Sequence, residues 1–281
     1  MQDYEIIFNG YHAKSKAFDP SIPPKLLIII WPSTGGNARA YRIKDSELEQ
    51  RKICLLRYNP TSHGNSIGNY NIPSSIEDLK NILKENDLLE VPIIGIGHSG
   101  GGAALVEFSQ QIVFSKLYLL SPILDSRLSL HFMYEKKNIS EFLTLLYPDS
   151  VKESNPESYH EKVRLIHSKL DTDEWLSKEH LNELDFPIYN SRIRVTSLAE
   201  FLRNLFIPGF TIYERIKTNS ENIKIFLPDA DNWYPISHTL EVIHQYNIDF
   251  EIITNAKDHF FTNSWLMIWN KINKEIKMNF I

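Results

Sequence analysis

The sequence predicts an α/β fold, in which a mostly parallel β-sheet is covered by helices on both faces. Short runs of Ile, Leu, Val and Tyr alternate with longer segments of helical periodicity, and this alternation is typical of parallel strands joined by helices. One apolar run passes directly into the stretch "GHSGGG", and a plausible helix follows it. The chain therefore contains a glycine-rich strand-to-helix turn within the alternating pattern.

Six apolar runs are candidates for strands buried in this sheet. They cover residues 25–31, 53–58, 91–97, 116–122, 222–228 and 250–256. Helices are expected over residues 73–89, 102–113, 234–246 and 261–278. Near the start of the chain, "EIIF" and "YHAKSKAF" predict an antiparallel entry into the sheet.

The alternating pattern is interrupted once, between residues 125 and 220. This stretch is charged and aromatic, and it contains helix-like segments but no clear strand run. The helix-like segments cover 137–147, 159–170 and 195–206. We interpret 125–220 as a helical cap over one end of the sheet, so that residues 1–124 and 221–281 form the core.

Composition and charge restrict the classes of function. The 281 residues are 42% hydrophobic, enough to bury a large core. With 30 basic and 35 acidic residues, the net charge of -5 provides no basic field for nucleic acid or an anionic membrane. No run reaches the roughly 18 apolar residues of a membrane span. The first residues lack the features of a signal peptide, so we expect a cytoplasmic protein. The sequence leaves open whether it is a monomer or a homodimer.

Metal and disulfide chemistry are not expected. Cys54 is the single cysteine, which excludes an internal disulfide and a multi-cysteine metal site. Pairs of histidines occur along the chain, but none has a third ligand at a suitable spacing. We therefore predict no metal site, and we interpret Cys54 as a small core residue.

Residues 97–101 read G-H-S-G-G and fit the G-x-S-x-G pattern of a nucleophile elbow, because they join a strand candidate to a helix candidate. In such a turn Ser99 has a strained backbone that exposes its hydroxyl, and side chains at Gly97 and Gly101 would clash. The start of the helix presents free N–H groups to an oxyanion, including that of Gly100. Ser99 is thus the candidate nucleophile, and a tight turn with a solvated serine is the alternative.

A serine nucleophile needs a histidine base that is itself oriented by a carboxylate. His259 follows the strand candidate 250–256, and two acidic residues, Asp229 and Asp231, follow the strand candidate 222–228. Asp231 has the better offset from its strand end. The chain order Ser99, Asp231, His259 is the order expected for an elbow of this kind.

Four stretches carry a resemblance to a known family, the α/β-hydrolases. "RYNPTSHGNS" is similar to the family's D-x-x-G-x-G-x-S strand end, with Asn59 in place of the aspartate. "LPDADNWYP" resembles G-x-x-D-x-x-x-P, which places the acid at Asp231, and "AKDHFF" resembles the G-H-F ending around His259. "WPSTGG" stands where the family has H-G-x-x-G, and it matches Ser33 to the second backbone N–H donor of the oxyanion hole.

The resemblance covers nearly the whole chain outside 125–220. It implies an eight-stranded, mostly parallel sheet with the cap inserted between the sixth and seventh strands. A minority of the family carries its acid after the sixth strand, where this chain has Asp125. Asp125 therefore remains an alternative to Asp231.

The resemblance further implies a serine hydrolase that cleaves an ester or thioester through an acyl-enzyme, without a cofactor. The aromatic cap favours a small molecule with a hydrophobic acyl or aryl group. Expected substrate contacts are Trp31 and His98 near the elbow, with the His98 side chain directed away from Ser99, and Phe206 and Phe210 in the cap. An acyltransferase, lyase or cyclising enzyme that uses the same triad is the main alternative. A binding protein that has lost catalysis is the third.

Overall fold

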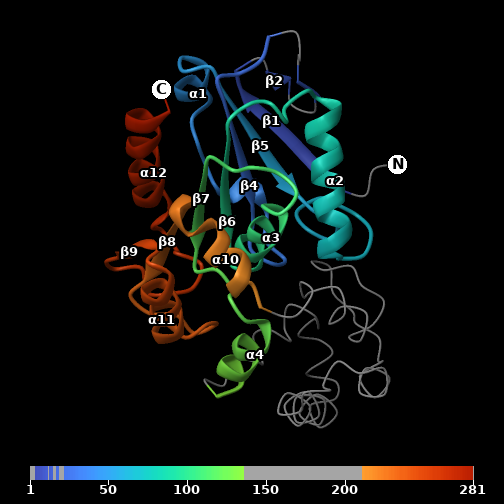
Figure 1. Ribbon diagram of the computed structural model, residues 1–281. Helices are drawn as coiled ribbons and strands as arrows, with labels where there is room; N and C mark the ends of the chain where they lie inside the picture. The colour runs from blue at the N-terminus through green and yellow to red at the C-terminus, as the bar shows by residue number, and fades with distance from the viewer. Residues whose placement is uncertain (1–3, 12, 15–16, 19–21, 136–210, 281) are drawn as a thin grey trace.

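The computed structural model describes residues 4–11, 13–14, 17–18, 22–135 and 211–280. These residues contain a seven-stranded sheet with helices packed on it (Figure 1). The strand order is β1-β5-β4-β6-β7-β8-β9, and β1 alone runs antiparallel to its neighbour. The strands are β1 (Glu5–Gly10), β4 (Leu26–Trp31), β5 (Ile53–Asn59), β6 (Ile93–His98), β7 (Lys116–Leu120), β8 (Ile223–Pro228) and β9 (Asp249–Ile253).

Strands occur at all six predicted positions, with small shifts in their bounds, but β9 lies at the edge of the sheet and only its Ile253 is buried. The predicted count of eight strands is wrong. The described part of the chain has seven strands in this sheet. β2 (Ala13–Lys14) and β3 (Ala17–Phe18) pair only with each other. Gly10 ends β1 with a φ of 80°, a left-handed conformation that glycine adopts readily, and the Tyr11 N–H still donates to the Ile53 carbonyl of β5 (3.0 Å). The second antiparallel segment forms a small hairpin of its own.

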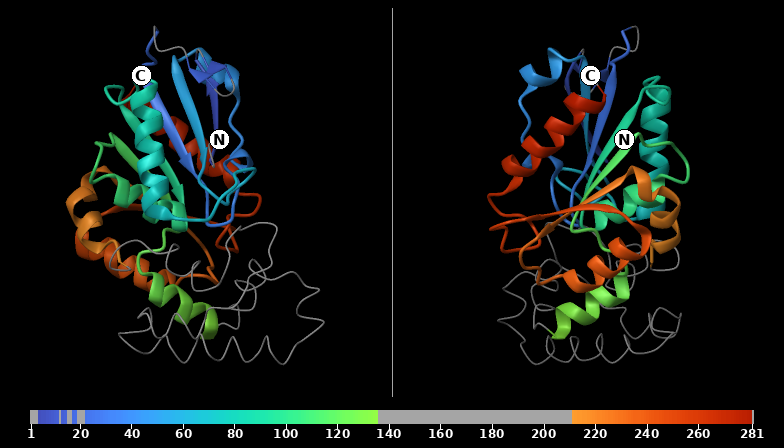
Figure 2. Two further views of the ribbon diagram at one scale, coloured as in Figure 1. Left: turned by 90° about the vertical axis from the view of Figure 1, so that its right-hand side faces the viewer. Right: turned by 60° about the vertical axis from the view of Figure 1, so that its left-hand side comes forward.

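Helices cover both faces of the sheet (Figure 2). One face packs against α1 (Asp45–Glu49) and α12 (Trp265–Asn279). The other packs against α2 (Ile72–Glu85), α3 (Gly100–Phe108), α10 (Tyr213–Asn219) and α11 (Ile236–Tyr246). Because both faces are covered, every residue of β4, β6 and β8 is buried, which explains the continuous apolar run of β4. The one charged residue among these strands, Lys224 of β8, pairs with Glu275 of α12 (2.5 Å). No helix in the described ranges is long and apolar enough to span a bilayer.

The chain leaves the sheet after β7 and returns to it at the same place. Asp125 forms an antiparallel bridge with Thr211, and α4 (Ser126–Glu135) begins beside it, below the sheet in Figure 1. Leu130 of α4 and Ile216 of α10 belong to the core cluster on one face of the sheet. The described ends of the predicted cap thus pack on the core. The helices predicted at 137–147, 159–170 and 195–206 lie outside the described residues, and the cap boundaries remain a prediction.

Candidate active site

Ser99 lies in the turn between β6 and α3, at the carboxyl edge of the sheet. Its φ of 55° and ψ of -122° form a conformation that residues other than glycine rarely adopt. The Ser99 N–H donates to the Leu120 carbonyl at the end of β7 (2.9 Å), and the Ser99 carbonyl accepts from the N–H groups of Gly102 (3.0 Å) and Ile123 (3.3 Å). These hydrogen bonds hold the strained turn against the neighbouring strand. Ser99 keeps 8% of its surface exposed.

Glycine is required by steric contacts at two positions of this turn. A Cβ on Gly97 would lie 2.6 Å from the Cα of Gly102, and a Cβ on Gly101 would lie 2.6 Å from the carbonyl oxygen of Trp31. Both neighbours are backbone atoms, so neither can move aside at low cost. The absence of a side chain at Gly101 lets the loop after β4 pass directly beside the start of α3.

Asp231 and His259 meet beyond the ends of β8 and β9. His259 Nδ1 lies 2.7 Å from Asp231 Oδ2, and both side chains are buried. Asp231 Oδ1 accepts from the N–H groups of Trp233 (2.7 Å) and Tyr234 (2.9 Å). Burial alone would raise the pKa of Asp231, but the electrostatic interaction with His259, the hydrogen bond to it and the two backbone hydrogen bonds together lower the pKa. An ionised carboxylate can only accept, so His259 carries its proton on Nδ1 and presents Nε2 as the basic nitrogen.

The basic nitrogen of His259 is buried and has no hydrogen-bond partner in the described part of the chain. The hydrogen bond from Ser99 to His259 is therefore not formed in this structure. Such bonds are often long before substrate binds and become shorter in the productive complex. The two loops that carry the acid and the base are joined directly, because the Asp229 N–H donates to the Ala256 carbonyl (2.8 Å).

The two alternative acids have other partners. Asp229 lies at the surface, where its Oδ2 accepts from Lys257 Nζ (2.9 Å) and from the Asn255 N–H (2.6 Å). Asp125 accepts from the N–H groups of Arg127 (2.9 Å) and Leu128 (3.1 Å) at the start of α4. Of the three candidate acids, Asp231 is the one in contact with His259.

The loop after β4 places Thr34, rather than Ser33, against the helix start. A Cβ on Gly100 would overlap Thr34 Oγ1. Ser33 lies near the Tyr41 hydroxyl and lowers the Tyr41 pKa against the larger rise caused by burial. Thr34, rather than Ser33, is therefore the residue of this loop that contacts the start of α3 at Gly100.

The sequence did contain a signal for Thr34. The H-G-x-x-G pattern ends on a glycine, and this loop has two in succession, Gly35 and Gly36. Ending the pattern at Gly35 selects Ser33, whereas ending it at Gly36 selects Thr34. The turn itself is closed by the Gly36 N–H, which donates to the Ser33 carbonyl (2.7 Å), with a φ of 71° at Gly35.

His63 supports this loop from the strand end of β5. Its Nε2 accepts from the Gly35 N–H (2.9 Å), and its Nδ1 donates to the Thr61 carbonyl (3.0 Å). Burial lowers the pKa of His63 to about 4, so the ring is neutral, as this pair of hydrogen bonds requires. Asn59, at the end of β5, accepts from the Ala38 N–H (2.7 Å) further along the same loop.

Two buried histidines predict that the protein loses stability in mild acid. The pKa of His63 is lowered to about 4, and that of His98 to about 3, mainly by burial. The unfolded chain binds protons at these side chains below the ordinary histidine pKa of about 6.5, so the free energy of unfolding falls as the pH falls below that value. Between pH 7 and pH 5 we expect a loss of about 2 kcal/mol for each histidine, measured by urea unfolding.

Two variants check the origin of this pH dependence. His98→Gln removes one titrating ring and should lose about half of the wild-type effect. His244→Gln changes an exposed histidine and should keep all of it. An unfolding free energy that is the same at pH 7 and pH 5 would contradict the buried, neutral state of both rings.

Of the expected substrate contacts, Trp31 and His98 need correction. Trp31 has no exposed surface and packs edge to face on Tyr58, with ring centroids 4.9 Å apart. His98 is 3% exposed, and both of its ring nitrogens are hydrogen-bonded within the protein. Phe206 and Phe210 lie outside the described residues.

Two aromatic side chains that the sequence patterns do not single out lie beside the base. The Trp233 ring stacks on His259, with centroids 6.0 Å apart. Phe260 lies edge on to His259 at 5.2 Å and is 44% exposed. Trp233 lies two residues after Asp231, and Phe260 directly follows His259. This closeness in sequence to the candidate acid and base is the signal that could have identified them.

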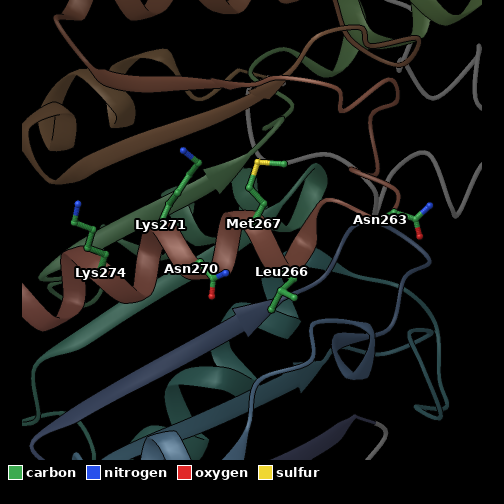
Figure 3. A pocket seen from close by; sticks show the side chains of 6 residues that line it. All are labelled: Asn263, Leu266, Met267, Asn270, Lys271 and Lys274. Carbon is green, nitrogen blue, oxygen red and sulfur yellow. The ribbon is translucent and has the colours of Figure 1, made fainter.

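A surface hollow on the outer side of α12 is separate from these residues (Figure 3). Its lining residues are Asn263, Leu266, Met267, Asn270, Lys271 and Lys274. It includes none of the predicted site residues. The described residues also contain no group of three or more His, Cys, Asp or Glu side chains that could hold a metal ion.

Comparison with known proteins shows that the chain is similar in fold to several solved structures. No protein-family model matches the chain, and no curated protein sequence matches it. Among solved structures, it is similar to a carboxylesterase of Nitrososphaera gargenis (TM-score 0.57, 12% identity, covering 98% of this chain and 94% of that one). MGS-M2, an alpha/beta hydrolase enzyme from a Medee basin deep-sea metagenome library, has a TM-score of 0.55 at 13% identity (96% and 90%). The thioesterase domain from the curacin biosynthetic pathway has a TM-score of 0.56 at 12% identity (96% and 95%).

Proposed function

The chain has the α/β-hydrolase fold, and on this premise we propose that it is a serine hydrolase acting on an ester or thioester with a hydrophobic acyl or aryl group. One observation carries the proposal. A buried aspartate holds His259 so that an unpaired basic nitrogen remains, on the same sheet edge as a serine in a strained elbow. A serine hydroxyl becomes a nucleophile only when such a base removes its proton.

The proposed reaction begins when His259 Nε2 removes the proton of Ser99 as Oγ attacks the substrate carbonyl. Asp231 stabilises the imidazolium, and the His259 proton then passes to the leaving group. Water repeats the sequence on the acyl-enzyme and releases the acid. The Gly100 N–H and the loop around Thr34 hold the oxyanion, at about 3 to 4 kcal/mol for each donor.

The preference for an apolar substrate rests on the surroundings of His259. Trp233 and the half-exposed Phe260 contribute aromatic surface next to the base. Apolar surface of this kind binds the non-reacting part of a substrate and not its carbonyl. The binding free energy that it contributes is retained in the transition state and raises kcat/KM.

The proposal predicts that kcat/KM rises with acyl chain length. Each added methylene that becomes buried contributes about 0.8 kcal/mol, which corresponds to about fourfold in kcat/KM, until the pocket is full. The measurement is a series of p-nitrophenyl esters and acyl thioesters from acetyl to dodecanoyl, with the Ser99→Ala variant as the blank.

Three outcomes of this series are distinct. Rising kcat/KM for esters or thioesters supports the proposed hydrolase. Consumption that requires an added alcohol, amine or thiol acceptor replaces it with the acyltransferase alternative. If acetyl esters are the best substrates, the proposed apolar acyl pocket is wrong.

A further inference from the structure

We infer that His98 and Tyr41 are positioning residues that tie the loop of the catalytic histidine to the loop after β4. The inference rests on the proposed function. His98 Nε2 lies 2.9 Å from the carbonyl oxygen of His259, and His98 Nδ1 lies 2.6 Å from Tyr41 Oη. A continuous chain of hydrogen bonds thus runs from Tyr41 through His98 to His259.

The position of each proton along these hydrogen bonds follows from the last acceptor, the His259 carbonyl. A carbonyl can only accept, so His98 carries its hydrogen on Nε2. His98 is neutral because burial, together with the nearby His259, lowers its pKa to about 3. The lone pair of Nδ1 therefore faces Tyr41, which donates its hydroxyl hydrogen to it. Both hydrogen bonds of His98 are thus satisfied by one arrangement of protons.

The chain joins three segments that are distant in sequence and that each carry part of the site. His98 precedes the nucleophile on β6, His259 lies beyond β9, and Tyr41 lies in the loop after β4. Aromatic contacts hold Tyr41 and His98 in place. The Tyr41 ring packs edge to face on Trp265, with centroids 5.1 Å apart, and the His98 ring centroid lies 5.5 Å from that of His259. Trp265 also donates from Nε1 to the Arg42 carbonyl (2.9 Å).

This arrangement suggests a specific role for the bond to the His259 carbonyl. The side chain of His259 is fixed by Asp231, but the distance from Nε2 to Ser99 also depends on where the His259 main chain lies. His98, the residue next to Ser99, holds that main chain directly. A misplacement of about 1 Å at reacting groups costs about 100-fold in rate, so loss of this bond should slow the reaction of Ser99 without removing any reacting group.

Two substitutions of His98 separate its two hydrogen bonds. A glutamine amide reaches the position of Nε2 and keeps a donor for the His259 carbonyl. An asparagine amide reaches only the position of Nδ1 and keeps an acceptor for Tyr41. Tyr41→Phe removes the hydroxyl and leaves both histidines in place. The exposed His244→Gln is the matched control for a histidine substitution.

The experiment measures the rate of fluorophosphonate labelling, kcat and KM of the best ester, and the Tm of each variant. We expect His98→Asn to lower the labelling rate and kcat by about 10- to 100-fold with KM little changed. His98→Gln should keep most of the wild-type labelling rate and kcat. Tyr41→Phe should give an intermediate loss in kcat. His244→Gln should match the wild type.

Each result decides a separate question. If the wild type is labelled at Ser99 but His98→Asn and His98→Gln have equal labelling rates and equal kcat, the inference is overturned and the proposed function is not. If the wild type is not labelled at Ser99, the proposed function is overturned. If His98→Asn does not fold, Tyr41→Phe decides: a kcat loss with unchanged KM and Tm supports the inference, and wild-type kcat overturns it.

Discussion

Ser99→Ala should abolish covalent labelling by a fluorophosphonate and lower kcat by about 10⁶-fold. Ser99 is the residue that the strained elbow presents at the carboxyl edge of the sheet, close to the loop of His259. Without its hydroxyl the remaining groups can orient the substrate and polarise its carbonyl, but they cannot form an acyl-enzyme. Peptide mapping of the labelled wild type locates the adduct, and the esterase assay gives the residual rate.

Ser121→Ala is the matched control for this experiment. Ser121 is also a buried serine at a strand end, with a positive φ of 39°, and its substitution tests whether strain and burial alone account for the loss. We expect it to be labelled at Ser99 at the wild-type rate. An adduct on any serine other than Ser99 would show that the elbow does not carry the nucleophile.

Asp231→Asn should lower kcat by about 10⁴-fold. The Asp231 carboxylate accepts from His259 Nδ1 and thereby leaves Nε2 free as the base. An asparagine amide can donate to Nδ1, which favours the tautomer with its hydrogen on Nε2, where it cannot accept the serine proton. The amide oxygen of the asparagine can still accept from the backbone N–H groups of Trp233 and Tyr234, as Asp231 Oδ1 does, so the fold should be retained.

Asp229→Asn provides the control, two residues away. Asp229 contacts Lys257 and the Asn255 N–H at the surface, and a surface ion pair of this kind contributes little to stability. We expect near wild-type kcat and a small change in Tm. A larger kcat loss for Asp229→Asn than for Asp231→Asn would reverse the assignment of the acid.

Local sequence patterns predict the strands and turns whose residues are determined by contacts close in sequence. Strands such as β4 and β6 are buried on both faces, so their continuous apolar runs were clear. The G-H-S-G-G turn was also recognisable, because its glycines are dictated by contacts within a few residues, as at Gly97. The separate hairpin of β2 and β3 was not, because strands of two residues each are too short to show an alternating pattern.

The environment of each site residue depended on contacts that cross the sheet. His98 was expected near the substrate, yet its ring is enclosed by Tyr41 and by the His259 carbonyl, which are remote from it in sequence. Ser33 is predicted to bind the oxyanion, whereas Thr34 is the residue that contacts Gly100, a contact between two segments remote in sequence. Asp231 and Asp229 were both plausible acids until the loop geometry separated them.

The most direct test of the proposed mechanism is to trap the acyl-enzyme with a substrate rather than an inhibitor. The wild-type protein is mixed with a p-nitrophenyl ester in excess, quenched in acid within milliseconds to seconds, and examined by intact-mass and peptide mass spectrometry. The account predicts a burst of p-nitrophenol close to one per protein molecule and an acyl group mapped to Ser99. Steady ester cleavage with no acyl adduct on Ser99 at any quench time would contradict it.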